Sequence, residues 1–224
     1  MALVASIILG STGWPGGAML AAFVIPSAVV GRLTLSRQGR GDPDETRTLG
    51  QVAANGGAAA AGSLTELAVP GMGLCIVATS LAAVSADTWA TAFGRLPSRD
   101  PRLLGFGPRV PKGTSGGVSL TGTLGAVAGA GWVAGVAALS MPDAGLILPA
   151  FGIGLGGMFL DSALGALAQA RFLCPICGNR DERRSHCGAP ARLVKGWRWL
   201  DNNGVNAVTG AGAALAGALL YQLR

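Results

Sequence analysis

Apolar segments alternate with polar loops along the entire chain. Segments rich in Gly, Ala, Leu and Val cover approximately residues 2–11, 15–33, 49–68, 70–92, 118–140, 144–171 and 203–222. Because a helix satisfies its own backbone hydrogen bonds, about 20 apolar residues in helical form can cross a bilayer. Every segment except the first has roughly that length. The pattern therefore predicts an all-α, polytopic integral membrane protein with six or seven transmembrane helices.

The short first segment ends at a glycine-rich break, Gly13 to Gly17. Its pattern is compatible with a crossing helix, a re-entrant segment or a cap on the bundle. We expect residues 1–224 to form one transmembrane domain, with a cytoplasmic, cysteine-containing loop at 172–200.

The basic residues predict an orientation. Of the 17 Lys and Arg residues, 16 lie at positions 32–47, 95–112 and 171–198, whereas the connections at Pro70-Gly71 and at residues 141–143 hold none. Cytoplasmic loops of membrane proteins carry the excess of Lys and Arg. The pattern predicts long cytoplasmic loops, short outer turns and an outer carboxyl terminus, in a multi-pass protein of the bacterial cell membrane.

Composition narrows the classes of partner. Charged residues are 12% of the chain and the mean hydropathy is +0.48, whereas soluble domains contain about 25% charged residues. The net charge of +6 does not indicate nucleic acid, because the basic clusters are separated by apolar spans. Anionic membrane lipids and phosphorylated substrates remain as partners. The 37 glycines are typical of closely packed membrane helices.

Two apolar segments each contain a carboxylate, Asp87 and Asp161. A charged side chain at the centre of a membrane helix costs at least about 2.5 to 3.5 kcal/mol, so such residues are rare without a partner or a function. Thr88 and Ser162 follow them directly, and oxygen-rich clusters of this kind suit Mg²⁺. The structural alternative is an ion pair with an arginine such as Arg95 or Arg171.

A glycine-rich run, Pro111 to Ser119, precedes the apolar segment at 118–140. Glycines allow backbone amides to approach an anion, and a helix amino terminus adds its positive dipole end. The run is therefore a candidate phosphate-binding loop, although it could also be a helix cap. Its candidate residues are Lys112, Gly113, Thr114, Ser115, Gly116 and Gly117.

Amides and a carboxylate gather at the starts of two further segments. Gln51 and Asn55 open one, and Asp201, Asn202, Asn203 and Asn206 open the last. Helix capping explains part of this pattern. Their common depth also predicts a polar site at the cytoplasmic ends of several helices.

The loop at 172–200 contains Cys174, Cys177, His186 and Cys187. Four such ligands suffice for tetrahedral zinc, which thiolates favour. A structural zinc site and free thiols in a reducing compartment both remain open.

Taken together, these stretches resemble the phytyl-phosphate kinase family of integral membrane proteins. The resemblance lies in Gln51-Val52 with Ala54-Asn55-Gly56, in Ala86 to Thr91 with Gly94, in Pro101-Arg102-Leu103, in Val110 to Ser119, in Gly157 with Asp161-Ser162 and Gly165-Ala166, and in Trp199 to Asn202 with Val205-Asn206. The chain is also similar, more distantly, to CTP-dependent phytol and dolichol kinases. It lacks their Glu before the loop glycines, which leaves the donor open between CTP and another nucleoside triphosphate.

The resemblance implies phosphoryl transfer from a nucleoside triphosphate, CTP being favoured, to an isoprenoid monophosphate such as phytyl or geranylgeranyl phosphate. Asp87, Asp161 and Asp201 would then hold Mg²⁺. The donor phosphates would lie against Thr88, Lys112 and the amides of the loop, and Asn55, Asn202 and Asn206 would orient phosphate or metal-bound water. Two other interpretations use the same residues: a nucleotidyltransferase that makes a CDP-activated lipid, and a transporter of a small anion or lipid. The oligomeric state stays open.

Overall fold

The computed structural model describes residues 1–36, 48–96, 99–141 and 144–223. Most of the first predicted basic loop, at 37–47, and the centre of the short turn at 141–143 lie outside the described residues.

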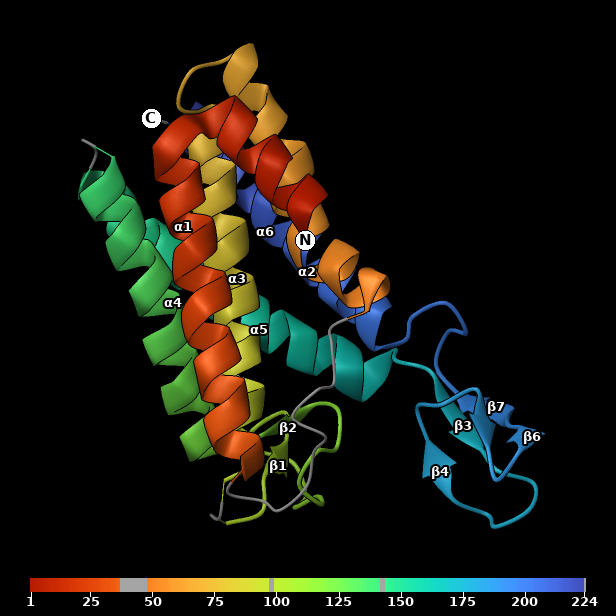
Figure 1. Cartoon of the computed structure of the whole chain (residues 1–224). Coiled ribbons are helices and arrows are strands. Elements are labelled where there is room, and N and C mark those ends of the chain that lie inside the picture. Colours follow the sequence, from red (N-terminus) through yellow and green to blue (C-terminus); the bar gives the residue numbers. More distant parts are fainter. Residues whose placement is uncertain (37–47, 97–98, 142–143, 224) are drawn as a thin grey trace.

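The described chain is mostly helical, as the apolar pattern predicts (Figure 1). It contains two short 3-10 helices, η1 and η2, and six α-helices, of which five are long and apolar enough to cross a membrane. The fold is therefore that of a polytopic membrane protein. The helices are α1 (Ala2–Ser36), α2 (Leu49–Ser63), η1 (Leu64–Leu67), α3 (Met72–Gly94), α4 (Leu120–Ser140), η2 (Ala144–Leu146), α5 (Ile147–Leu167) and α6 (Asn202–Gln222).

Helix α2 is the one α-helix outside that set, because the apolar segment at 49–68 changes to 3-10 geometry after Ser63. It begins at a capping box in which Thr48 and Gln51 satisfy each other's backbone amides. Within η1, Glu66 accepts hydrogen bonds on its carboxylate from the amides of Gly71 and Leu74, which fixes the turn into α3.

Helix α1 consists of two arms joined by a reversal at Gly13, where φ is 64° and ψ is −156°. Glycine adopts such a backbone without a steric penalty. Figure 1 shows the first arm rising beside α2 and the second arm descending along α3 and α4. The first arm begins near the middle of α2, since a Cβ on Gly56 would lie 2.9 Å from Val4 Cγ1, and it ends where Ser11 donates to Ser63 Oγ. The first predicted segment is thus a short arm, residues 2–12, that folds back on the second arm at Gly13.

Helix α3 is the centre of the bundle and contacts each of the other five α-helices. Its residues 75–86 are all buried. Helix α4 approaches it through glycines: a Cβ on Gly125 would lie 2.7 Å from the Trp89 carbonyl oxygen, and a Cβ on Gly129 would lie 2.7 Å from that of Ser85. Helix α5 approaches in the same way through Gly157. These contacts have the small-residue packing that the glycine-rich segments predict.

The long connections share one end of the bundle, which we call the loop end (Figure 1). The connection from α3 to α4 contains the strand pair β1 (Arg102–Leu103) and β2 (Gly117–Val118). The connection from α5 to α6 forms a small module of three antiparallel strands, β4-β3-β7, and a hairpin, β5-β6. Their bounds are β3 (Arg171–Leu173), β4 (Arg180–Asp181), β5 (Ser185–His186), β6 (Ala189–Pro190) and β7 (Arg192–Lys195).

The carboxyl-terminal part of α6 lies at the opposite end, where Tyr221 Oη donates to the Pro70 carbonyl at 2.7 Å. The two long basic loops that the structure describes, and the turn at Pro70, thus lie at opposite ends of the bundle. The assignment of the loop end to the cytoplasm remains a prediction from the charge pattern.

Gly129→Ala is expected to destabilise the protein by about 1–3 kcal/mol, because the added methyl group overlaps the Ser85 carbonyl and α3 must move away from α4. Gly135→Ala in the same helix is the matched control, since a Cβ there meets nothing within 4 Å. Thermal unfolding in detergent measures both variants. Equal midpoints would contradict close α3–α4 packing.

Candidate functional site

A polar cavity of about 200 Å³ lies at the loop end, between α3, α4, α5 and the long connections. Its lining comes from sequence segments that are far apart. It comprises Asp87, Ala90, Thr91, Gly94, Arg95, Pro101, Gly113 to Ser119, Gly122, Thr123, Met158, Asp161, Ser162, Gln169, Glu182 and Asn202.

The two intramembrane carboxylates both line this cavity. Asp87 on α3 and Asp161 on α5 each lie about two turns before the end of their helix. Asp161 Oδ2 is buried and has no hydrogen-bond partner among the described residues. Neither carboxylate forms a salt bridge with any described residue. The ion pair with Arg95 or Arg171, which was the structural alternative, is therefore not observed among these residues.

A third carboxylate, Glu182, lines the same cavity as Asp87 and Asp161. Like charges around one cavity repel each other unless a cation or protons compensate them. Oxygen ligands of this type suit a hard divalent cation such as Mg²⁺. The buried, unpartnered Oδ2 of Asp161 fits such an ion, because a coordination bond would satisfy it.

The glycine-rich loop forms one wall of the cavity. Gly113 and Gly116 have φ values of 83° and 81°, and the Gly117 amide donates to the Thr114 carbonyl at 2.9 Å. A Cβ on Gly116 would lie 2.5 Å from Ala166 Cβ, so the loop backbone rests directly on the last turns of α5. This contact places the loop beside Asp161.

The loop caps a helix and also lines the cavity. Ser119 caps α4 by accepting from the Gly122 amide at 3.1 Å, while residues 113–119 line the cavity. The amides of Thr114 and Gly117 are engaged in turns, whereas those of Ser115 and Gly116 have no hydrogen bond among the described residues. Of these four backbone amides, those of Ser115 and Gly116 remain available to bind an anion in the cavity.

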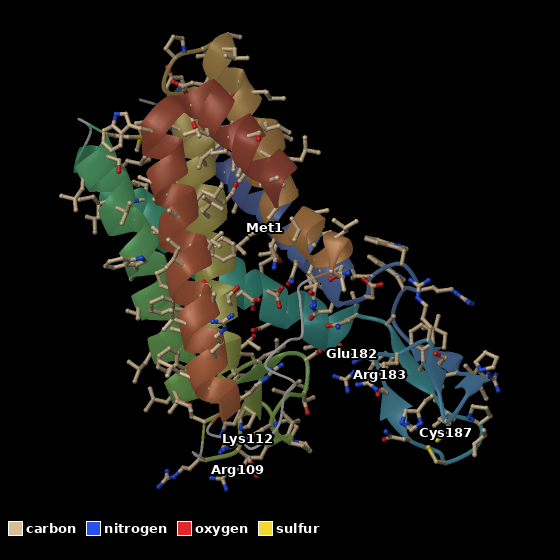
Figure 2. The ribbon with its side chains drawn as sticks, viewed as in Figure 1. Met1, Arg109, Lys112, Glu182, Arg183 and Cys187 are labelled. Carbon is tan, nitrogen blue, oxygen red and sulfur yellow. The ribbon has the colours of Figure 1, made fainter. Side chains whose placement is uncertain are left out.

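Lys112 lies outside the cavity lining. Its Nζ donates to the Leu96 carbonyl at 2.9 Å, just beyond the end of α3. Figure 2 shows it next to Arg109 in the same connection. Among the described residues, Arg95, which follows α3 directly, does line the cavity.

The polar residues at the start of α6 are only partly at the cavity. Asn202 lines it. Asp201 caps α6 by accepting from the Gly204 amide at 3.1 Å, and its other oxygen lies 3.4 Å from an Arg184 nitrogen. Its carboxylate is therefore already occupied. The remaining candidates, Thr88, Asn55 and Asn206, also lie outside the lining.

Sequence reasoning did not find two polar cavity residues whose bonding is informative, Glu182 and Gln169. Glu182 comes from the α5–α6 module and accepts a hydrogen bond from Ser115 Oγ. Gln169 follows α5, and its buried Nε2 has no partner within the described chain. Glu182 belongs to a run of charges at residues 180–184 that is typical of a solvated loop, so no local signal separates it from its neighbours.

The cysteine residues of the module form a compact Cys₃His cluster. The ligand atoms of Cys174, Cys177, His186 and Cys187 all lie within 4.8 Å of one another, and the cysteines are free of disulfides. Ligands of a tetrahedral zinc ion are about 3.8 Å apart at Zn–S distances of about 2.3 Å. The cluster thus has the composition and the size of a zinc site.

Local turns explain how neighbouring residues can both face this cluster. Cys187 and Gly188 have φ values of 53° and 74° and form the two-residue turn between β5 and β6. That geometry is typical of a tight hairpin turn. It allows His186 Nδ1 to lie 3.2 Å from Cys187 Sγ and 3.3 Å from Cys177 Sγ.

The thiols of the cluster differ in acidity. A hydrogen bond from the Cys177 backbone lowers the pKa of the Cys174 thiol to about 6, whereas hydrogen bonding to the Cys177 side chain raises the pKa of Cys187 to about 11. The lowered pKa of Cys174 favours its thiolate, which is the form of cysteine that binds metals.

Gly116→Ala is expected to destabilise the loop more than Gly113→Ala. Both positions have a left-handed backbone, which costs an alanine about 1–2 kcal/mol. Only the Gly116 variant adds an overlap with Ala166, worth about a further 1–3 kcal/mol. Thermal unfolding and the rate of tryptic cleavage after Lys112 measure the difference. Indistinguishable variants would show that the loop does not rest on α5.

Comparisons with known proteins place the chain among membrane proteins. The family model described as Integral membrane protein DUF92 matches residues 1–214. The chain is 34% identical over 141 residues to Protein PGR of Arabidopsis thaliana. This alignment covers 57% of this chain and 48% of the relative, so the chain spans about half of the relative's length. It is 31% identical over 168 residues to an uncharacterized membrane protein of Methanocaldococcus jannaschii, covering 74% of this chain and 70% of the relative. No solved structure matches. The chain belongs to the DUF92 family of integral membrane proteins.

Proposed function

We propose that this protein is a membrane-embedded phosphotransferase. It transfers a phosphoryl group from a nucleoside triphosphate to an isoprenoid monophosphate and releases an isoprenoid diphosphate. The observation that carries the proposal is the cavity that joins Asp87, Asp161 and the glycine-rich loop at one end of the helix bundle. The resemblance to phytyl-phosphate kinases supplies the substrate class and favours CTP as the donor.

The location of the cavity fits a substrate with a charged head and an apolar tail. The cavity lies at the ends of membrane-spanning helices and is predominantly polar. The head group would enter it from the loop end, while the tail stays in the bilayer. The proposal includes that the loop end faces the cytoplasm, because the basic loops lie there and nucleotides are cytoplasmic.

The residues of the chain account for the proton requirements of this reaction. A phosphate monoester has its second pKa near 6, so the acceptor oxygen is ionised at neutral pH and needs no general base. The chain's one histidine, His186, is held in the Cys₃His cluster. An acceptor oxygen forms the new bond to the γ-phosphorus, and the bond to the β-phosphate oxygen breaks with its electron pair on the leaving nucleoside diphosphate.

The remaining requirement is compensation of the crowded negative charge. Mg²⁺, held by Asp87 and Asp161, would neutralise part of the charge of the phosphates when bound. Arg95 adds a fixed positive charge on the cavity wall. The amides of Ser115 and Gly116, which have no hydrogen-bond partner among the described residues, would hold phosphate oxygens, and Asn202 would orient them.

Asp161→Asn and Asp87→Asn are each expected to lower turnover by about 100-fold or more. They remove ligand charge with little change in volume, and a bound metal supplies several kcal/mol of charge stabilisation. The purified protein is incubated with geranylgeranyl phosphate, labelled CTP and Mg²⁺, and products are separated. Asp100→Asn is the control, because Asp100 is an exposed carboxylate outside the cavity lining.

Isoprenoid diphosphate and CDP are the expected products of the wild-type protein. A CDP-lipid with pyrophosphate would instead identify a nucleotidyltransferase, and no product with any nucleotide would favour transport. Full activity of Asp161→Asn would reject the proposed cation site.

Arg95→Ala is expected to raise the donor KM by about tenfold, since it removes a guanidinium from the cavity wall. Lys112→Ala is expected to leave the donor KM within about twofold and to lower the melting temperature, because Lys112 bonds to the Leu96 carbonyl and does not line the cavity. Steady-state kinetics at saturating acceptor measure both. A larger increase of the donor KM in Lys112→Ala than in Arg95→Ala would instead indicate that Lys112 binds the donor.

A further inference from the structure

The Cys₃His cluster brackets the segment that reaches the cavity. Cys174 and Cys177 precede residues 178–185, and His186 and Cys187 follow them. A metal ion bound by all four residues would close this segment into a short loop with both ends fixed. Glu182, which lines the cavity, lies in the middle of that loop.

Glu182 and Arg184 of this loop contact residues beyond the strands of the module. Glu182 accepts a hydrogen bond from Ser115 Oγ in the glycine-rich loop. Arg184 lies 3.4 Å from the Asp201 carboxylate and donates to the Arg198 carbonyl at 3.2 Å. Figure 2 shows Glu182 on the side of the module that faces the helix bundle, whereas Cys187 lies on its far side. The cluster is therefore separate from the cavity and connected to it through this loop.

The module has little else to hold it together. Its strands are two to four residues long, and Phe172 and Cys174 are its fully buried residues within 171–195. Residues 175–180 are all exposed. Small domains without a sufficient hydrophobic core usually need a metal or disulfides to fold, and the cysteines here form no disulfide.

We propose that Cys174, Cys177, His186 and Cys187 bind one zinc ion, and that this ion holds Glu182 against Ser115 as the third carboxylate of the cavity. The zinc has a structural role, because four protein ligands leave no open coordination position. Glu182 is a positioning residue for the divalent cation that Asp87 and Asp161 bind. This second part rests on the proposed function, whereas zinc binding by the cluster does not.

The first arm of the experiment measures the metal. Full-length protein is purified in detergent with zinc, dialysed, and analysed for zinc per chain, and a cobalt-loaded sample is examined by absorption spectroscopy. We expect one zinc per chain, and thiolate-to-cobalt charge-transfer bands with the intense d–d bands of a tetrahedral site. Cys177→Ser should lose both. Cys75→Ser is the matched control and should keep both, because Cys75 is buried in α3 and is not part of the cluster.

The second arm measures cation binding in the cavity without catalysis. Mn²⁺ serves as a paramagnetic probe for the Mg²⁺ site, and its binding to zinc-loaded protein is followed by electron paramagnetic resonance with Mg²⁺ as competitor. Glu182→Gln should keep its zinc and weaken Mn²⁺ binding by about tenfold. Wild-type protein stripped of zinc by a chelator should show the same loss, and zinc should restore it. Asp100→Asn should bind Mn²⁺ like the wild type.

The outcomes separate this inference from the proposed function. A zinc-free wild type, or Cys177→Ser with unchanged zinc and cobalt spectra, would overturn the zinc site. Unchanged Mn²⁺ affinity in Glu182→Gln and in the stripped protein, together with weaker binding in Asp161→Asn, would overturn the role of Glu182 and leave the proposed function intact. Absence of Mn²⁺ binding to the wild type would overturn both the role of Glu182 and the proposed function. Circular dichroism checks that each variant keeps its helices.

Discussion

A carboxylate inside a membrane-spanning helix has to be solvated, paired or bound to a cation, because hydrocarbon offers it no partner. Asp87 and Asp161 are such carboxylates, and the architecture of the loop end follows from where they lie. Both sit near the same end of the bundle and open into one polar cavity. The walls of that cavity come from α3, α4 and α5 and from the connections that fold over the helix ends.

Close backbone contacts hold these walls in place. Gly116 packs its backbone on Ala166, and a Cβ on Gly165 would lie 3.1 Å from the Gly116 nitrogen and 3.3 Å from Ser115 Cβ. The same device brings α4 and α5 against α3, through Gly129 and Gly157. Because lipid tails are as apolar as the helix surfaces, association inside a membrane depends on such close packing. Small residues therefore position the cavity as well as the helices.

The module between α5 and α6 adds a part that is not embedded in the bundle. It attaches to the end of α5 through Lys195, whose Nζ donates to the Ala166 carbonyl at 2.6 Å, and through the Trp197 amide, which donates to the Ala168 carbonyl at 3.0 Å. These bonds satisfy carbonyl groups that a helix end leaves without partners. The module is thereby fixed beside the cavity, and Glu182 reaches into it from there.

The sequence alone determined the membrane class, the helical fold, the two ends of the bundle and the pair of carboxylates, because hydropathy and charge are local properties that a bilayer reads directly. It also pointed to the cysteine cluster through ligand type. Only the tertiary structure decided that the chain reverses at Gly13 and that Glu182 lines the cavity. It also decided that Lys112 bonds to the Leu96 carbonyl and that Asp201 caps α6. Each of these depends on where a backbone turns and on which group is nearest after folding. Side-chain type and spacing leave such choices open, since a lysine or an aspartate can satisfy a carbonyl, an amide or a ligand equally well.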